Sequence, residues 1–394
     1  MHFRNLSILV LCQLISATGS IVIVTLGGII GTSLSPNPAF ATLPVSVLVI
    51  GTATMTIPAA LLMKRIGRKA GFAMSSISAG LAMLLAAMSL WLNSFAWFIV
   101  AAGLLGINLA FTQQYRYAAA ESVEPRYVGR AISFVLVGAI GGAFIGPELV
   151  AFGQYRVQGV PFAGTLVAVA CLYFIQFVLF LMLGPIRRES SSEQGHSART
   201  LSGIARQPVF IVAVLSGTVA YGVMTFIMTA TPISMHVNDG YSIADTARVI
   251  RSHVLGMYVP SLLSGFLLDR FGTVKIMTIG VVALILAALI GFHDRTYLHY
   301  TVALIILGAG WNFLYVGATT TLTLTYSMAE RFKAQAMNEF SVFGTAAVAS
   351  LMAGTVMHLF GWTVLVLAPI PILLSILVAL YLVRNDSLLQ SSRT

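Results

Sequence analysis

Ionisable side chains inside long apolar runs are the residues of this sequence best placed to do chemistry. Glu148 lies about 18 residues into the run 130–152, and Arg251 and His253 lie about seven to nine residues into the run 244–268. A charge in an apolar segment is costly and therefore marks a functional candidate. A partly desolvated glutamate or a histidine can load and release a proton, whereas an arginine suits an anionic group. We predict Glu148 and His253 as proton carriers and Arg251 as a substrate ligand.

Each of these groups has an alternative, structural role. Glu148 would then be an interfacial partner for Arg156, and the two groups in the run 244–268 would belong to an internal hydrogen-bond network. Arg248 lies nearer the outer end of the same run, and its spacing from Asp245 permits an i, i+3 ion pair. Residue type and spacing leave both roles open.

Two asparagines and a tryptophan form a second group of candidates. Asn108 and Asn312 occupy equivalent places in the runs 95–119 and 297–326, and Trp311 is adjacent to the second amide. The paired amides are predicted to bind substrate at mid-membrane, and Trp311 offers a stacking surface for a planar ligand. The alternatives are hydrogen bonding between helices and packing of Trp311 in the core.

The elements that must position these residues are apolar helices. Only 9% of the 394 residues are charged and 58% are hydrophobic, against roughly 25% charged in an average soluble domain. Runs of about 20 apolar residues can each cross a hydrocarbon core of about 30 Å. We therefore predict an all-α integral membrane protein of twelve transmembrane helices. The twelve runs are 8–32, 40–63, 70–91, 95–119, 130–152, 161–184, 208–235, 244–268, 274–293, 297–326, 334–358 and 361–384.

Several other classes of protein fit the sequence poorly. The net charge of +10 is scattered between apolar runs, whereas nucleic-acid binding needs basic residues gathered on one soluble face. Cys12 and Cys171 lie in separate apolar runs, so we expect neither a disulfide nor a metal site. The sequence has no Gly-x-x-x-x-Gly-Lys nucleotide-binding loop, no HExxH motif and no serine-nucleophile elbow. It also has no recognisable selectivity filter of a channel. We therefore expect that the protein is not an ATP-driven pump, not an enzyme and not a channel.

The lysines and arginines indicate the orientation. With a cytoplasmic amino terminus, the inside segments hold seventeen of the 22 cations and the outside loops hold only Arg156 and Arg295. Cytoplasmic loops are enriched in such residues. We predict a multi-pass protein of the cytoplasmic (inner) membrane, with both termini in the cytoplasm.

The sequence also contains an internal repeat on either side of a polar linker. The motif at residues 64–67 recurs at 269–272, and the motif at 126–131 recurs at 331–336, each 205 residues later. A constant offset in equivalent loops predicts two pseudo-symmetric six-helix bundles with the same membrane orientation. The predicted domains are 1–186, a cytoplasmic linker at 187–207, and 208–394.

With these motifs in place, the sequence resembles the major facilitator superfamily over essentially its whole length. The hallmark Gly-x-Leu-Ala-Asp-Arg-x-Gly-Arg-Lys of that family is matched at residues 265–272, and a degenerate copy stands at 60–69. The resemblance implies a cytoplasmic gate in which Asp269 and Arg270 form a latch; the alternative is a pair of topogenic charges. The predicted gating residues are Lys64, Arg65, Gly67, Arg68, Gly265, Asp269, Arg270, Gly272 and Glu339.

The resemblance also bears on the cavity and on the direction of transport. Because the first, fourth, seventh and tenth helices line the cavity in this family, Gln113 and Arg116 are expected in the inner vestibule; snorkelling to the interface is the alternative for Arg116. The run 130–152 resembles the glycine-rich, Gly-Pro-ending motif of proton-coupled antiporters, although helix packing explains its glycines equally well.

We therefore predict a secondary active transporter of a small organic solute that works by alternating access and is coupled to protons. Proton-antiport export is our first choice. The alternative is proton-symport uptake of a metabolite, vitamin or siderophore. The expected partners are the substrate, protons and the lipid bilayer, and we expect a monomer without a cofactor.

Overall fold

Helices form along the apolar runs because a segment inside hydrocarbon must satisfy its own backbone N–H and C=O groups. The computed structural model describes residues 3–122, 128–184, 186, 199–327 and 330–390. Throughout these residues the regular structure is helical, without a strand. Nine helical segments in this part of the chain are long and apolar enough to cross a membrane.

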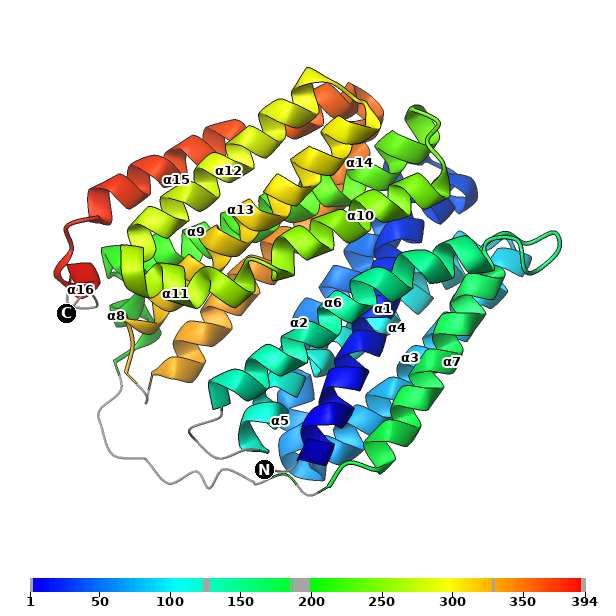
Figure 1. The fold of residues 1–394 in the computed structure, drawn as a ribbon, viewed down its shortest axis with the longest axis horizontal. Helices are drawn as coiled ribbons and strands as arrows, with labels where there is room; N and C mark the ends of the chain where they lie inside the picture. Colours follow the sequence, from blue (N-terminus) through cyan, green and yellow to red (C-terminus); the bar gives the residue numbers. More distant parts are fainter. Residues whose placement is uncertain (1–2, 123–127, 185, 187–198, 328–329, 391–394) are drawn as a thin grey trace. The chain divides into compact units, whose positions relative to one another are not determined.

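The helices before the linker follow the first six predicted runs. They are α1 (Phe3–Leu34), α2 (Leu43–Ile66), α3 (Arg68–Trp91), α4 (Phe95–Thr112), α5 (Tyr115–Glu121), α6 (Val128–Gly153) and α7 (Ala163–Leu181), with a 3₁₀ turn at Pro38–Phe40 (Figure 1). The fourth run differs from the prediction because Gln113 and Gln114 interrupt it. The Gln114 N–H donates to the Phe111 carbonyl at 2.9 Å, so the helix tightens there into an i, i+3 turn.

The helices after the linker follow the other six runs. They are α8 (Leu201–Ala205), α9 (Pro208–Pro232), a π-helical turn η3 (Ile233–Asn238), α10 (Ile243–Tyr258), α11 (Ser261–Phe271), α12 (Thr273–His293), α13 (Tyr297–Thr323), α14 (Arg331–Leu367), α15 (Ile370–Val383) and α16 (Ser387–Gln390). The run 244–268 is divided into α10 and α11 at Pro260, which has no N–H to continue the helical ladder.

The last two predicted spans meet at one residue. Gly361 lies within α14 and has a φ of 75°, which breaks the helical geometry without inserting a loop. The run 334–358 thus ends just before Gly361, and the run 361–384 continues through the end of α14 into α15.

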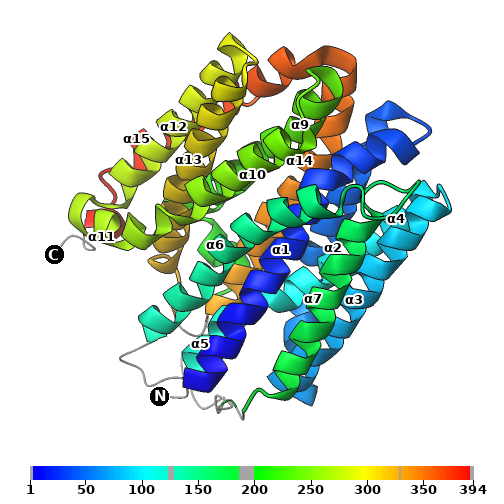
Figure 2. The ribbon, with the colours of Figure 1, turned by 45° about the vertical axis from the view of Figure 1, so that its right-hand side comes forward.

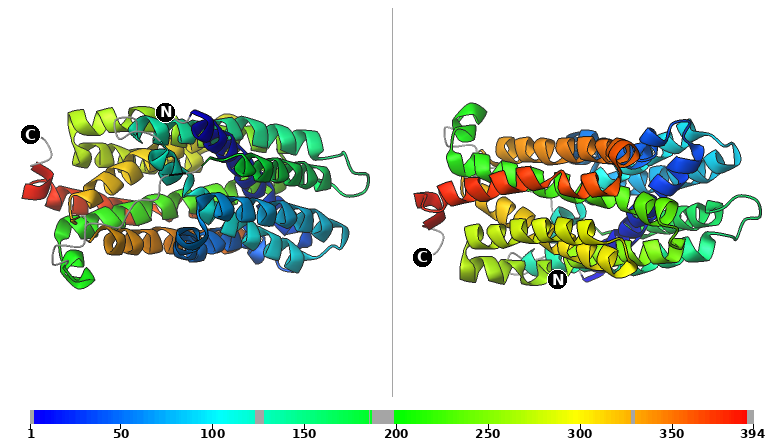
Figure 3. Two further views of the ribbon diagram at one scale, coloured as in Figure 1. Left: turned by 90° about the horizontal axis from the view of Figure 1, so that it is seen from below. Right: turned by 90° about the horizontal axis from the view of Figure 1, so that it is seen from above.

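Two compact units divide the chain. Unit 1 holds Met1–Glu189 with Thr229–Arg251, and unit 2 holds Ser190–Met228 with Ser252–Thr394. In unit 1, α1 lies alongside α6, and α3 lies alongside α7 (Figure 2). In unit 2, α12 lies between α13 and α15, with the helices running side by side (Figures 1 and 3). The predicted domain boundaries stay a prediction, since the units are not a simple cut at the linker.

Equivalent glycines make equivalent helix contacts in the two units. A Cβ added to Gly51 of α2 would lie 2.7 Å from the Gly103 carbonyl oxygen of α4. A Cβ added to Gly256 of α10 would lie 2.5 Å from the Ile305 carbonyl oxygen of α13. Small residues let membrane helices approach this closely. Residues 51 and 256 stand at the repeat offset of 205, so the duplicated pattern corresponds to a duplicated packing contact.

Candidate substrate and coupling site

Four aromatic rings gather in unit 2 at the meeting of α9, α13 and α14. Trp311 and Tyr315 of α13 are stacked, with ring centroids 5.2 Å apart and planes at 13°. Tyr221 of α9 stands edge-on to both, at 5.3 and 5.0 Å, and Phe343 of α14 lies 5.4 Å from Tyr221. Trp311 and Phe343 are buried, whereas the two tyrosines are half-buried. We call these residues the four-ring cluster; only Trp311 was singled out from the sequence.

The two predicted amides bind neighbouring helices. Asn108 donates to the Ser75 carbonyl at 3.0 Å, and Asn312 donates to the Met257 carbonyl at 2.9 Å. Asn312 also accepts from the Ser264 hydroxyl at 2.5 Å. Both asparagines are fully buried. These contacts are those of the helix-bonding alternative, and a substrate role for either amide stays a prediction.

Glu148 and Arg251 come together within unit 1. An Arg251 guanidinium nitrogen lies 3.4 Å from a Glu148 carboxylate oxygen and joins α10 to α6, and the guanidinium lies 5.5 Å from the Phe144 ring centroid. The Glu148 side chain is 74% exposed and that of Arg251 is 25% exposed. Arg156, the other partner considered, instead lies over the Phe152 ring at 4.1 Å. Two residues chosen separately from the sequence thus form one ion pair.

A second ion pair on the same helix was predicted and is confirmed. Arg248 donates to the Asp245 carboxylate at 2.8 Å across one helical turn. Both side chains are more than 30% exposed, so the pair contributes little to stability.

His253 is fully buried between α10 and α13. Its Nδ1 lies 2.8 Å from the Leu304 carbonyl oxygen. A carbonyl can only accept, so Nδ1 carries the proton and Nε2 presents a lone pair. Nε2 is buried and has no hydrogen-bond partner among the described residues. A proton would need a change of packing to reach it, and the coupling role of His253 stays a prediction.

The predicted vestibule residues lie at or near helix interruptions. Gln113 forms part of the turn between α4 and α5, and Arg116 lies in the first turn of α5; both side chains are half-buried. Glu339, predicted for the gate, is half-buried on α14. This exposure fits residues beside a polar vestibule, and their roles stay predictions.

Glycine makes both predicted gate turns. Gly67 between α2 and α3 has a φ of 89°, and Gly272 between α11 and α12 has a φ of 82°. Their N–H groups donate to the carbonyls of Met63 and Leu268 at 2.9 and 2.8 Å. Residues that have a side chain rarely adopt this positive-φ backbone conformation, so each turn requires glycine. Gly265, by contrast, lies within α11, and a Cβ added there would meet nothing within 4 Å.

The structure describes some of the charged side chains predicted for the gate. Arg65 and Arg270 are exposed, Arg68 is half-buried, and the Arg270 guanidinium lies 5.5 Å from the ring centroid of the next residue. The side chains of Lys64 and Asp269 lie outside the part of the chain that the structure describes. The latch therefore stays a prediction.

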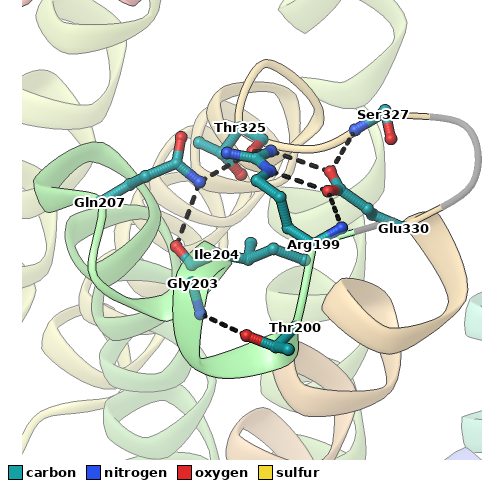
Figure 4. A network of polar contacts seen from close by, with 8 residues as sticks. All are labelled: Arg199, Thr200, Gly203, Ile204, Gln207, Thr325, Ser327 and Glu330. Carbon is teal, nitrogen blue, oxygen red and sulfur yellow. Dashed lines mark hydrogen bonds and ion pairs between the residues drawn. The ribbon is translucent and has the colours of Figure 1, made fainter. Parts of the chain in front are cut away.

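A polar contact that sequence reasoning missed ties the end of the linker to the segment between α13 and α14 (Figure 4). The Arg199 guanidinium donates to both Glu330 carboxylate oxygens, Nε at 2.7 Å and a terminal nitrogen at 2.8 Å, and the Arg199 backbone N–H donates at 2.8 Å. The Ser327 N–H donates at 2.9 Å, and Arg199 and Gln207 both donate to the Thr325 carbonyl at 3.0 Å. We call the Arg199–Glu330 pair the linker clasp.

The clasp is a strong electrostatic contact. The Glu330 side chain is only 3% exposed. The Arg199 guanidinium, followed by the Ser327 backbone N–H, holds the pKa of the Glu330 carboxyl well below its ordinary value. The same hydrogen bond raises the pKa of Arg199. A lone acidic residue next to the repeated cationic loop at 331–336 was the available signal in the sequence.

Known sequences are similar to this chain over nearly its whole length. The family model of the Major Facilitator Superfamily matches residues 9–247 and 240–393. The riboflavin transporter RfnT of Brucella anthropi is 37% identical over 380 residues, which cover 96% of this chain and 95% of that protein. An uncharacterized MFS-type transporter of Bacillus subtilis, YdeG, is 27% identical over 372 residues, covering 90% and 86% of the two chains.

Solved structures share the fold at low sequence identity. A mutant of the nucleoside transporter NupG superposes with a TM-score of 0.77 at 16% identity, covering 96% of this chain and 99% of that one. A bacterial homolog of the human lysosomal transporter Spinster superposes with a TM-score of 0.75 at 14% identity, covering 100% and 99%. At these identities the likeness concerns the fold alone.

Proposed function

The chain belongs to the Major Facilitator Superfamily, and from that premise we propose that it carries riboflavin, or a closely related flavin, across the cytoplasmic membrane into the cell. The observation that carries the proposal is the 37% identity to a riboflavin transporter along 96% of the chain. A flavin needs a carrier because its hydroxyl-bearing side chain and ring carbonyls are costly to bring unbonded into hydrocarbon.

Vitamin uptake was the alternative to proton-antiport export in our sequence predictions, and the similarity to RfnT favours it. The export interpretation depended on the glycine motif of α6. Those glycines lie against α1: a Cβ added to Gly142 would be 2.6 Å from Ala17 Cβ, and one added to Gly146 would be 2.9 Å from Ile21 Cγ2. Close packing of α1 on α6 therefore accounts for the motif without an antiport mechanism.

For coupling we propose the Glu148–Arg251 pair. The flavin ring and its ribityl chain are uncharged at neutral pH, so a neutral substrate does not require Arg251 as a counter-ion. The guanidinium is instead bonded to Glu148 across the contact of α6 with α10. A proton on the carboxylate would remove this attraction and loosen the contact between the two helices. Proton loading would thereby favour one of two helix arrangements during alternating access.

The test of the proposed function is uptake of radiolabelled riboflavin by a bacterial host that neither makes nor imports the vitamin. Cells that produce this protein should accumulate the label, and excess unlabelled riboflavin should compete while a nucleoside should not. A protonophore should abolish accumulation if protons drive it. Uptake no greater than in cells with an empty vector, at demonstrated membrane expression, would contradict the proposal.

The same cells test the coupling pair. Glu148→Gln keeps the shape of the side chain and removes its charge and titration. The variant should exchange labelled for unlabelled riboflavin as the wild type does, while its accumulation ratio should fall to unity. Asp245→Asn is the control, because it removes a half-buried, ion-paired carboxylate of α10 whose hydrogen bonds come from Ser242 and Arg248. Undiminished accumulation by Glu148→Gln would exclude Glu148 as the carrier.

A further inference from the structure

Helix α13 meets its neighbours with residues of very different size. It carries glycines where α10 and α12 approach: a Cβ added to Gly308 would lie 2.6 Å from the His253 carbonyl oxygen of α10, and one added to Gly310 would lie 2.9 Å from the Gly280 carbonyl oxygen of α12. On the side that meets α9 and α14 it carries Trp311 and Tyr315 instead, four residues apart and therefore on one helix face. Small residues suffice for helix packing in a membrane, so bulky rings on this face call for another explanation.

Three of the four rings have no aromatic counterpart in the other half of the duplicated chain. At the repeat offset of 204, Trp311 corresponds to Ile107 and Tyr315 to Phe111; at the offset of 205, Tyr221 corresponds to Ser16 and Phe343 to Gly138. Ser16 accepts a hydrogen bond from Gln176, and Gly138 packs against α1. A packing role inherited through duplication would be expected in both halves. Trp311, Tyr221 and Phe343 therefore point to a role that belongs to the second half alone.

Two buried hydrogen-bond donors accompany the rings. The indole Nε1 of Trp311 and the hydroxyl of Thr218 are buried and make no hydrogen bond within the part of the chain that the structure describes. Thr218 lies three residues before Tyr221 on α9 and so shares its helix face. Buried donors are nearly always satisfied in proteins, and each exception needs a reason. Donors beside aromatic faces are what an acceptor-rich planar ring requires.

We propose that the four-ring cluster binds the ring system of the transported substrate. The substrate's flat heteroaromatic ring stacks on these side chains, and carbonyl oxygens or ring nitrogens at its edge accept hydrogen bonds from Trp311 Nε1 and Thr218 Oγ1. The inference rests on the proposed transport of a flavin and adds the residues that hold its ring. The half-buried Tyr221 and Tyr315 provide the faces that a ligand can reach, and the buried Trp311 stacks behind Tyr315.

Binding to the purified, full-length protein tests this assignment directly, because flavin fluorescence is quenched when the ring stacks on an electron-rich aromatic side chain. Riboflavin and lumiflavin, which keeps the ring without the ribityl chain, are titrated separately. Trp311→Leu should weaken both by about tenfold or more, the range of stacking on an aromatic side chain. Trp311→Phe keeps an aromatic face, loses the N–H, and should weaken binding by about fivefold. Tyr221→Leu should weaken binding like Trp311→Leu, and Tyr221→Phe should not.

Trp97→Leu is the matched control, since Trp97 is an exposed tryptophan of α4 in unit 1; its affinity for both flavins should equal that of the wild type. Each variant is compared by gel filtration and thermal melting, and if Trp311→Leu does not fold, Trp311→Phe and Tyr221→Leu decide. If the folded variants bind both flavins as tightly as the wild type does, the ring site is overturned and the proposed function is not. Absence of riboflavin binding by the wild type would overturn the proposed function and the ring site with it.

Discussion

At the scale of single residues, two glutamates show how the same side chain suits opposite tasks. Glu330 is almost fully buried and accepts four N–H groups, three from Arg199 and one from Ser327. Glu148 is 74% exposed and meets Arg251 at 3.4 Å. Several short hydrogen bonds to a buried carboxylate hold two chain segments together, whereas one long contact to an exposed carboxylate is easily replaced by a contact with water. The contacts of Glu330 suit a residue that holds the linker, and those of Glu148 suit the proposed contact that changes during transport.

Neutralising Glu330 should release the clasp. In Glu330→Gln the guanidinium of Arg199 loses both charged acceptors, so the segment that follows Arg199 should detach more often. Proteolysis follows the population of the opened state, and trypsin should cleave after Arg199 about tenfold faster in the variant, measured by mass spectrometry of inside-out vesicles. Asp386→Asn is the control, because Asp386 also accepts a backbone N–H, that of Leu388, but does not contact Arg199.

The pH dependence of the clasp follows from the lowered pKa of Glu330. A carboxyl with a depressed pKa in the folded state contributes stability above its ordinary pKa of about 4.3 and loses it as the pH falls below that value. The raised pKa of Arg199 keeps the guanidinium charged throughout the neutral range. Cleavage after Arg199 in the wild type, divided by the activity of trypsin on a small peptide at the same pH, should therefore be independent of pH from neutrality down to mildly acidic conditions. A rise in cleavage near neutral pH would contradict this assignment of charge.

At the scale of elements, the turns at Gly67 and Gly272 are equivalent joints in the two units. Each combines a positive φ with an extended ψ, 156° and 154°, a region that is open essentially to glycine alone. The same joint therefore connects α2 to α3 in unit 1 and α11 to α12 in unit 2.

Alanine substitutions separate the glycines that are required from those that are not. Gly67→Ala and Gly272→Ala should each destabilise the protein by about 1–3 kcal/mol, seen as a lower melting temperature in detergent. Gly265→Ala should leave the melting temperature unchanged or raise it, because a Cβ meets no atom there and alanine favours a helix over glycine by about 1 kcal/mol. Equal melting temperatures for all three variants would show that the two turns can relax to accept a side chain.

The helices illustrate what could be predicted from the sequence. Apolar runs gave the twelve spans, because length and hydropathy are properties of a contiguous segment. The break at Pro260 also has a local cause. The interruption at Gln113 and Gln114 does not, since neither residue prevents a helix. The partners of Trp311 were missed for a related reason: Tyr221 and Phe343 lie 90 residues before it and 32 after it, and only tertiary packing brings them together.

At the scale of the whole molecule, membership of the Major Facilitator Superfamily and the all-helical fold were predicted and are confirmed. The chain is a transporter rather than an enzyme, as expected from its family. The direction of transport, proton coupling, the monomeric state and the orientation in the membrane stay predictions. Substrate identity was the least accessible to sequence reasoning, because the four-ring cluster, which we propose as the ring site, comes from three helices whose meeting is not encoded locally.

Orientation has a direct test. In a variant without Cys12 and Cys171, single cysteines replace Ser202 on α8 and Arg295 between α12 and α13, both exposed. An impermeant thiol reagent added to intact cells should label Arg295→Cys only, and Ser202→Cys should react once the membrane is opened. Labelling of both from outside would contradict the twelve-span topology.

In the orientation predicted from the lysines and arginines, the single-residue junction at Gly361 faces the outside of the cell, which has a practical consequence for detecting the protein there. Because Gly361 joins two spans without a loop, that site has no spare chain in which an epitope would be displayed, and an inserted tag would pull one of the last two spans out of register. Residues 154–162, between α6 and α7, form a longer connection whose side chains are mostly exposed. Antibody staining of whole cells is therefore best engineered there, where an insertion lengthens a loop and leaves the helices in place.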